Sequence, residues 1–299
     1  GREMWREWDV EKVVESSKAV KDDYTGVSVR LGEVNPDEDL VGTGACRLRT
    51  NGETVGVYDA AGRMVGKLPL TRVRHMRTQF AAALRVPGVV EELCPGTFAE
   101  ELVKLLGRYK DGEDKTGGQV RMQNHWATPP ELLGCLIGLS GARTERFASP
   151  LNHDLRIPRY YSAHARDRLF GAWHDAFSVQ FTGSSYMNPE YEGPDLYRAL
   201  RWAIQATEGG GDALTVAVFP RWEKWRYMNL LSHPHVHVVA KFAAHSFSFL
   251  PPDHHRHQQR GSGVAKWPVL VLVIAGRAGL DRHWVGGPRP SGGWRNNSA

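Results

Sequence analysis

The sequence has few cysteines and no long hydrophobic run. Its three cysteines, Cys46, Cys94 and Cys135, stand far apart and form no Cys-x-x-Cys pair. This spacing argues against a disulfide framework and a zinc knuckle, and it is typical of a reducing compartment. The longest apolar run covers Val269 to Ala275, whereas a membrane-spanning helix needs about 20 residues. Since the first residues also contain no hydrophobic signal-peptide segment, we expect a soluble intracellular protein without a membrane partner.

Several enzyme signatures are also missing. The chain contains no Gly-x-x-x-x-Gly-Lys-Ser/Thr, no His-Glu-x-x-His and no Gly-x-Ser-x-Gly, and Gly42-Thr43-Gly44 lacks the third glycine of a dinucleotide fingerprint. These absences argue against nucleotide hydrolases, zinc peptidases and α/β-hydrolases. The histidines at positions 233, 235, 237, 254, 255 and 257 fall in a strand and a loop without the spacing of metal ligands. We therefore expect no metal.

The charge balance and the aromatic content favour a nucleic-acid partner. Lys and Arg number 38 against 33 Asp and Glu, which gives a formal net charge of +5 and a pI near 9.1. Such an excess favours polyanionic partners. The chain also has ten tryptophans, and Trp is one of the side chains on which unpaired bases stack. The alternative is that most of them pack in the core.

Residues 1–120 are expected to form a small N-terminal β/helical module. Alternating apolar residues, with turn signals at Asn51-Gly52 and Ala61-Gly62, predict a β-meander over 44–70. A helix capped by Thr71 is expected next, and a second helix over 97–109 follows. Because the first of these helices is rich in arginine, the module is expected to contact the substrate; a solvated basic face is an equal alternative. The arginines are Arg72, Arg74, Arg77 and Arg85.

A polar, glycine-rich stretch over 111–123 marks the predicted domain boundary. Beyond it, residues 121–285 alternate between helical and β-rich segments. The expected helices cover 129–139, with Thr128 as N-cap, and 194–207, and the expected strands cover 214–219, 236–242 and 269–275. This alternation predicts an α/β sheet. Residues 286–299 have the composition of a disordered tail.

The motif Asn188-Pro189-Glu190-Tyr191 offers a specific chemistry. Methylation of an exocyclic amine requires oxygens that accept the amine hydrogens, so that the nitrogen lone pair points at the methyl donor. Asn188 supplies a side-chain oxygen, and Pro189, with its fixed φ and no N–H, supplies a rigid carbonyl. Tyr191 offers a flat face for the base. The same spacing also occurs in an Asn-Pro turn ahead of a helix.

Four strings of residues follow one another along the second part of the chain. They are HWATPPELL at 125–133, ERFASPLN at 145–152, FG at 170–171 and GSSYMNPEY at 183–191. Downstream come PRW at 220–222 and WP at 267–268, the latter just before an apolar run. Over about residues 124–285, this order resembles the cap-specific adenosine N6-methyltransferase family, also called the phosphorylated-CTD-interacting factor family.

The resemblance implies a Rossmann-like methyltransferase fold, S-adenosylmethionine as methyl donor and N6 of adenine as acceptor. It implies that Asn188, Pro189 and Tyr191 form the catalytic site and that Glu190, Tyr191 and Trp222 contact the substrate. The residues implied for the cofactor pocket are Thr128, Pro129, Phe147, Ala148, Ser149, Pro150, Asn152, Phe170 and Gly171.

Glu190 departs from the family pattern, which has a second proline at that position. A carboxylate there would accept a further hydrogen bond, repel phosphate or mark an inactive site.

From the resemblance we expect methyl transfer to the cap-adjacent adenosine of RNA. The alternatives are a DNA adenine N6-methyltransferase, since phage-type enzymes share the Thr128-Pro129 pattern, and an inactive protein that binds RNA or a partner. No WW domain is visible, and a nuclear location is favoured over a cytoplasmic one.

Overall fold

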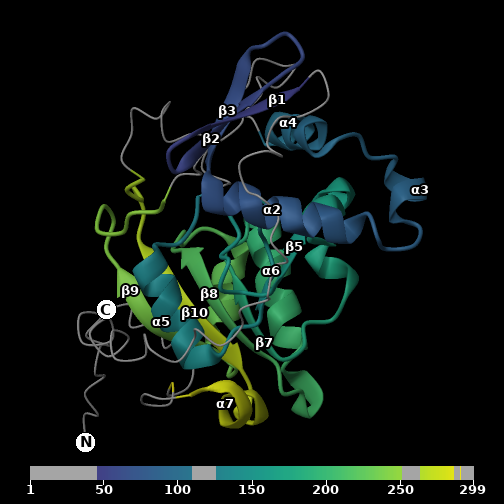
Figure 1. Cartoon of the computed structure of the whole chain (residues 1–299). Coiled ribbons are helices and arrows are strands. Elements are labelled where there is room, and N and C mark those ends of the chain that lie inside the picture. Colours follow the sequence, from purple (N-terminus) through teal and green to yellow (C-terminus); the bar gives the residue numbers. More distant parts are fainter. Residues whose placement is uncertain (1–45, 110–125, 251–262, 286–289, 291–299) are drawn as a thin grey trace, which may run out of the picture.

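The computed structural model describes residues 46–109, 126–250, 263–285 and 290. Two sheets with packed helices form a mixed α/β structure, one sheet of three strands and one of seven (Figure 1). The α/β class predicted from the sequence is confirmed. The predicted linker over 111–123, the first 45 residues and nearly all of the tail lie outside the described residues.

The N-terminal module (residues 46–109) begins with the predicted β-meander. Its strands are β1 (Arg47–Asn51), β2 (Thr54–Tyr58) and β3 (Met64–Pro69), which pair antiparallel in that order. Leu48, Val55 and Leu68 are buried on one side of this small sheet. The predicted turn at Asn51-Gly52 is present, and Gly52 has a φ of +59° there.

Three helices complete the N-terminal module. They are α2 (Leu70–Ala83), α3 (Val89–Leu93) and α4 (Phe98–Arg108). The predicted cap of α2 at Thr71 is wrong, because β3 runs directly into the helix and Pro69, with a φ of −59°, takes the N-cap position. The second predicted helix is confirmed as α4, in which Thr97 and Glu100 form a capping box.

The large sheet has the strand order β6-β5-β4-β7-β8-β10-β9. Its strands are β4 (Thr144–Glu145), β5 (Arg159–Ser162), β6 (Trp173–His174), β7 (Ser184–Met187), β8 (Leu214–Pro220), β9 (Val236–Phe242) and β10 (Val269–Ala275). The first five positions are parallel neighbours, and β10 is antiparallel to both β8 and β9. Every residue of β8 and β10 is buried, as expected for strands covered on both faces.

Helices α5 (Pro130–Ser140), α6 (Gly193–Gln205) and α7 (Arg277–His283) pack on the large sheet. Short 3₁₀ segments connect other elements: η2 (Ala165–Phe170), η3 (Ala176–Ser178), η4 (Glu208–Gly210) and η5 (Arg226–Ser232). The predicted N-cap of α5 at Thr128 is wrong, since Pro129 is the N-cap and makes no side-chain cap bond. The Thr128 hydroxyl instead accepts a hydrogen bond of 2.7 Å from the buried Tyr186 hydroxyl.

The N-terminal module shares a core with the large-sheet half of the chain. Leu151, Leu169 and Phe170 belong to the same buried cluster as Val73, Met76 and Leu102 of the module. Helix α2 lies between the small sheet and the large one and contacts η2 (Figure 1). In the part of the chain that the structure describes, no helix is both long and apolar enough to cross a membrane.

Candidate active site

A cavity of about 540 Å³ opens at the carboxyl ends of the parallel strands. It is lined by the residues that directly follow four neighbouring strands: 146–149 after β4, 163–164 after β5, 175–177 after β6 and 188–190 after β7. The chain leaves β4 and β7 in opposite directions across the sheet, so a crevice forms between them. Ligands of open α/β sheets bind at this position.

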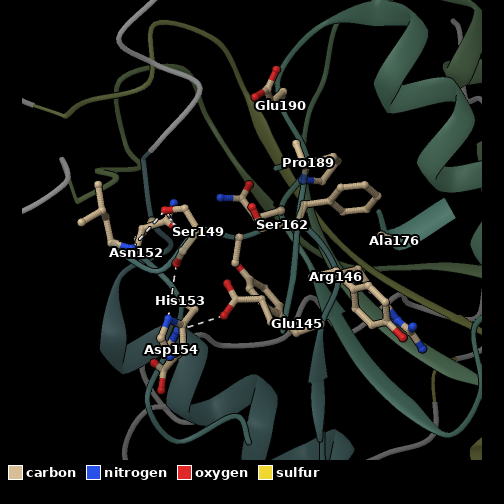
Figure 2. Close-up of a pocket in the computed structure, with 18 of the residues that line it drawn as sticks. Glu145, Arg146, Ser149, Asn152, His153, Asp154, Ser162, Ala176, Pro189 and Glu190 are labelled. Carbon is tan, nitrogen blue, oxygen red and sulfur yellow. Dashed lines mark hydrogen bonds between the residues drawn. The ribbon is translucent and has the colours of Figure 1, made fainter. Parts of the chain in front are cut away.

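Glu145, the last residue of β4, is buried beside the cavity. The backbone N–H of Asp154 donates a hydrogen bond of 2.9 Å to Glu145 Oε2 (Figure 2). Burial raises the pKa of Glu145 to about 8, although this hydrogen bond and the Arg72 guanidinium oppose the rise. The site therefore holds a carboxyl group that changes charge near neutral pH and would respond to a bound cation.

The loop that follows β4, residues 146–154, is closed by its own side chains. Asn152 Oδ1 accepts from the Ser149 backbone N–H at 2.7 Å and from the Ser149 hydroxyl at 2.9 Å (Figure 2). The aromatic ring of Phe147 packs against Phe177, which follows β6. The structure thus brings Phe147, Ser149 and Asn152 together at the cavity. The Asn152 side chain fixes the shape of the loop through its two hydrogen bonds to Ser149.

Arg72 of helix α2 holds the 146–154 loop from outside the large sheet. Its guanidinium donates to the backbone carbonyl of Pro150 at 3.2 Å and to that of His153 at 3.0 Å. His153 is buried and stacks on Tyr160 with ring centroids 3.9 Å apart. Burial, with the nearby Arg72 cation, lowers the pKa of His153 well below its usual range, so the ring is neutral. Arg72 therefore acts on the cavity and not as part of a free basic face.

A buried polar network ties the N-terminal module to the loop after β5. Asp167 accepts hydrogen bonds from Tyr109 and from Ser162, each of 2.6 Å, and pairs with Arg108 at 2.5 Å. Tyr109 and Arg108 lie at the end of α4, and both line the cavity together with Ser162. Residues 59 positions apart are thereby joined at the wall of the site.

After β6 the backbone turns sharply at Asp175. Its φ of +51° is unusual for a residue other than glycine. Its carboxylate accepts a hydrogen bond of 2.9 Å from the backbone N–H of Phe177, and its own N–H donates to the carbonyl of Ser162 at 2.9 Å. Strained residues of this kind cluster at functional sites. The turn presents an acidic group and an aromatic ring to the cavity.

Asn188 lies at the end of β7 with its amide held in one orientation. Its Nδ2 donates a hydrogen bond of 2.9 Å to the backbone carbonyl of Trp126. Its Oδ1 is buried and has no partner among the residues that the structure describes. A buried acceptor without a donor costs free energy unless a ligand satisfies it. The side chain therefore presents an oxygen that is prepared to accept a hydrogen bond.

Pro189 and Glu190 continue the wall of the cavity from Asn188. Figure 2 shows Pro189 and Glu190 at one end of the cavity, with Glu145 and Asp154 at the other. Pro189 is buried, whereas the Glu190 side chain is exposed. Partial desolvation raises the pKa of Glu190, and the carboxylates of Asp195 and Glu192 add to the effect. An exposed acidic side chain thus lines the cavity two residues after Asn188.

Two residues expected to contact the substrate lie outside this cavity lining. Tyr191 is buried and contacts Phe249 and Trp267 edge to face, and Trp222 also packs edge to face on Tyr191. The Tyr191 hydroxyl donates a long hydrogen bond of 3.4 Å to the backbone carbonyl of Val218. Both aromatic rings therefore belong to the packing behind the Asn188-Pro189 segment.

The expected cofactor residues divide into two groups. The cavity brings together Thr128, Phe147, Ala148, Ser149 and Asn152, whereas Pro129, Pro150, Phe170 and Gly171 do not line it. The Phe170 ring packs against Phe80 and Phe98 of the N-terminal module. The backbone carbonyl of Phe170 accepts a hydrogen bond of 2.7 Å from the hydroxyl of Tyr160, which lies on β5. Phe170 therefore contacts this strand without lining the cavity.

Several lining residues were not expected from the sequence. They are Arg108, Tyr109, Glu145, Arg146, Ser162, Asp175 and Phe177. Arg146 is buried between the rings of Phe181 and Tyr161, and burial lowers its pKa to about 10, so it remains a cation. The available signal was position alone, since Glu145, Ser162 and Asp175 stand at or just after strand ends. Those strands are too short to be recognised from periodicity.

Among the described histidines of the C-terminal half, His233 and His235 lie with ring centroids 5.2 Å apart. His235 Nδ1 lies 2.8 Å from the Thr207 hydroxyl, and His237 Nε2 lies 3.3 Å from the carbonyl of Ala275. In the described ranges, no group of three or more His, Cys, Asp or Glu side chains is arranged to hold a metal ion. His254, His255 and His257 lie outside the described residues.

Comparison with known proteins gives a family for the chain. No curated protein matches it. The family model described as "Phosphorylated CTD interacting factor 1 WW domain" matches residues 91–249. The matched segment begins within helix α3 and ends beyond β9, so it includes all four strand ends that line the cavity. Because this match covers just over half of the 299 residues, the chain belongs to the phosphorylated CTD interacting factor 1 family.

Proposed function

We propose that the protein is an S-adenosylmethionine-dependent methyltransferase that acts on N6 of adenine in nucleic acid. The observation that carries the proposal is the fixed amide of Asn188: its Oδ1 is buried without a partner among the described residues, and the residue lines the same cavity as Pro189. Membership of the family supports the cap-adjacent adenosine of RNA as the first candidate substrate.

The topology of the large sheet supports this proposal. Counted along the chain from β4, the strands stand in the order 3-2-1-4-5-7-6. The first five positions have the order of a doubly wound Rossmann sheet, and the cavity lies where that order reverses. Nucleotide-containing ligands bind at this point in such sheets. The strand order thus supports a Rossmann-like fold with its ligand between β4 and β7.

The acceptor chemistry follows from Asn188 and Pro189. An adenine amine carries two hydrogens and donates both. Asn188 Oδ1 accepts one of them, and the Pro189 carbonyl, held by the fixed φ of the ring, accepts the other. With both hydrogens held, the nitrogen lone pair is directed towards the half of the cavity that follows β4 and β6. Positioning and preorganised acceptors supply the catalysis.

The other half of the cavity has the groups that S-adenosylmethionine requires. The carboxyl groups of Glu145 and Asp175 suit the ammonium and hydroxyl groups of such a ligand, and the rings of Phe147 and Phe177 suit its adenine. When bound, S-adenosylmethionine supplies an electrophilic methyl group. Ser149 and Asn152 keep the 146–154 loop in shape, and Thr128 lies at the boundary between the two halves.

The test offers capped RNA that begins with adenosine, uncapped RNA and DNA, each with labelled S-adenosylmethionine. Digestion and mass analysis separate the N6-methylated ribose and deoxyribose products. Asn188→Ala is expected to lower turnover at least about 100-fold, or about 2.7 kcal/mol, while cofactor affinity is retained. Activity is also expected to survive EDTA.

Asn229→Ala is the matched control, because Asn229 is an exposed asparagine on η5. It should leave turnover unchanged. Product on DNA but not on RNA would favour the DNA adenine enzyme. Cofactor binding without product on any of the three substrates would overturn the enzymatic proposal and favour the inactive binding protein.

A further inference from the structure

A tryptophan beside the amine-holding segment is exposed to solvent. Of the tryptophans that the structure describes, only Trp173 and Trp225 are exposed, with 52% and 45% of their surface accessible. Trp225 follows β8, in the segment between that strand and η5. Tryptophan is enriched at interfaces and is a common contact for ligands that have one flat apolar face.

The Trp225 ring is supported from behind and does not hang free. An ideal Cβ on Gly193 would lie 1.6 Å from the ring atom Cζ3, so the indole packs directly on the glycine backbone. Trp222 flanks it with ring centroids 6.0 Å apart, and the backbone N–H of Trp225 donates to the backbone carbonyl of Trp222 at 3.0 Å. Gly193 and Trp222 thus hold the indole in place, while 45% of the residue's surface stays accessible.

Gly193 places this ring close to the proposed acceptor site. It begins α6, three residues after Glu190 at the end of the cavity. Since consecutive Cα atoms are 3.8 Å apart, the two Cα atoms are separated by at most about 11 Å. A nucleotide next to an adenine held by Asn188 would therefore be within reach of the Trp225 ring.

The residues around Trp225 suit a nucleic-acid strand. Its chain neighbours Lys224 and Arg226 are both exposed cations, and the Arg226 guanidinium lies 4.6 Å from the centre of the Tyr197 ring. Aromatic rings beside Lys and Arg are the usual arrangement for unpaired bases, in which the ring stacks on the base and the cations meet the phosphates. Enzymes that take one base out of a strand often contact its neighbours as well.

We propose that Trp225 is a stacking platform for the base next to the acceptor adenine in a single strand, with Lys224 and Arg226 at the adjacent phosphates. This inference rests on the proposed function and names a contact that function leaves open. It also moves an expected substrate contact from Trp222, which packs against Tyr191 and Trp267, to the residue three positions later.

The test measures the dissociation constant of the full chain for a fluorescently labelled single-stranded oligonucleotide that contains one adenine, as RNA and as DNA. Trp225→Ala is expected to weaken binding by about tenfold or more. Trp225→Leu keeps apolar bulk over Gly193 but has no aromatic face, and should weaken binding to a similar extent. Trp225→Phe should retain most of the affinity. The matched control is Trp173→Ala, because Trp173 is similarly exposed but lies on the edge strand β6. This variant should bind as wild type.

The same variants are then assayed for methyl transfer to the oligonucleotide and to adenosine alone. Trp225→Leu should raise KM for the oligonucleotide and leave the reaction of adenosine unchanged. Wild-type affinity in both Trp225→Ala and Trp225→Leu would overturn the stacking platform, whatever the enzymatic result. If the wild type methylates nothing but the Trp225 variants still lose affinity, the proposed function fails and the platform stands.

Discussion

The two halves of the cavity are stabilised by different kinds of interaction. The half that follows β4, β5 and β6 rests on strands of two to four residues and is held by hydrogen bonds and ion pairs from α2 and α4. The half that follows β7 is held by the neighbouring apolar strand β8 and by the aromatic cluster around Tyr191. One half depends on charge and the other on packing.

The difference has a physical reason. Short polar strands bury little apolar surface, so they cannot hold loops in place by the hydrophobic effect alone. In this half of the cavity, Arg72 and the Asp167 network hold the loops with fixed hydrogen-bond donors and acceptors. The acceptor half needs one amide and one carbonyl in a constant position, and a close-packed aromatic core provides that rigidity. The N-terminal module is therefore a wall of the proposed cofactor half.

The largest expected effect tests the packed half. Tyr191→Ala should lower the free energy of unfolding by about 3–5 kcal/mol, because it removes a large buried ring from the cluster with Phe249 and Trp267. Tyr191→Phe should cost less than about 1 kcal/mol, since the hydroxyl makes only a 3.4 Å bond. Urea unfolding measures both. Normal stability together with a loss of nucleic-acid affinity would instead show that Tyr191 stacks on the base.

The second prediction tests the charged half. Asp167→Asn should lower the free energy of unfolding by about 3 kcal/mol, because Arg108 loses the carboxylate that balances its partly buried charge. The control is Asp212→Asn, which breaks the exposed pair with Arg282 and should cost less than about 1 kcal/mol. Equal losses in the two variants would contradict the distinction between the halves.

The third prediction uses pH. Glu145 has a folded-state pKa of about 8, above the ordinary value of a glutamate, so the folded protein keeps a proton that the unfolded chain releases. Its contribution to stability is therefore present at low pH and is lost as the pH rises towards 8. Relative to Glu145→Gln, the wild type should lose about 2 kcal/mol between about pH 5.5 and about pH 7.5. Parallel stability profiles of the two proteins would exclude this ionisation.

The fourth prediction concerns Arg72. Arg72→Lys should weaken the binding of S-adenosylmethionine by about tenfold, or about 1.4 kcal/mol, because a single ammonium cannot hold the carbonyls of Pro150 and His153 together. Titration calorimetry measures the affinity. Arg74→Lys, an exposed neighbour on α2, should bind as wild type. A loss in both variants would mean that general charge on the helix matters more than the loop.

The smallest expected effect is at Glu190. Because its side chain is exposed, Glu190→Pro, which restores the family pattern, should change the rate of methyl transfer by less than about threefold. Single-turnover kinetics on the preferred substrate measure it. Loss of activity would show that the carboxylate has become one of the groups that hold the amine.

The same contrast decides what could be predicted from the sequence. Strands β8, β9 and β10 are seven-residue segments rich in apolar residues, and all three were predicted. Strands β4 and β6 have two residues each, so no periodicity reveals them. Thr128 looked like a helix cap, but a tertiary partner, the Tyr186 hydroxyl, takes its oxygen. Local patterns thus predict the elements that are long enough to show a regular run of apolar residues.

The cavity was predictable only in part for a related reason. Asn188 and Pro189 form a local motif, and Phe147 to Asn152 form another, so both could be read from the chain. Arg72, Tyr109 and Asp167 reach the site through contacts between residues 58 to 81 positions apart. No local spacing encodes such contacts. A module without a recognisable motif thus supplies part of the cavity wall.

The hydrogen bond from Asn188 to the Trp126 carbonyl has a consequence for base selection. It keeps the NH₂ end of the amide turned away, so both groups proposed to meet position six of the purine are oxygens. A base with a carbonyl at that position, as in guanine or in deaminated adenine, would set oxygen against oxygen and leave buried acceptors unsatisfied. The orientation of one side chain would thus let the site distinguish adenine from hypoxanthine, the product of its hydrolytic deamination.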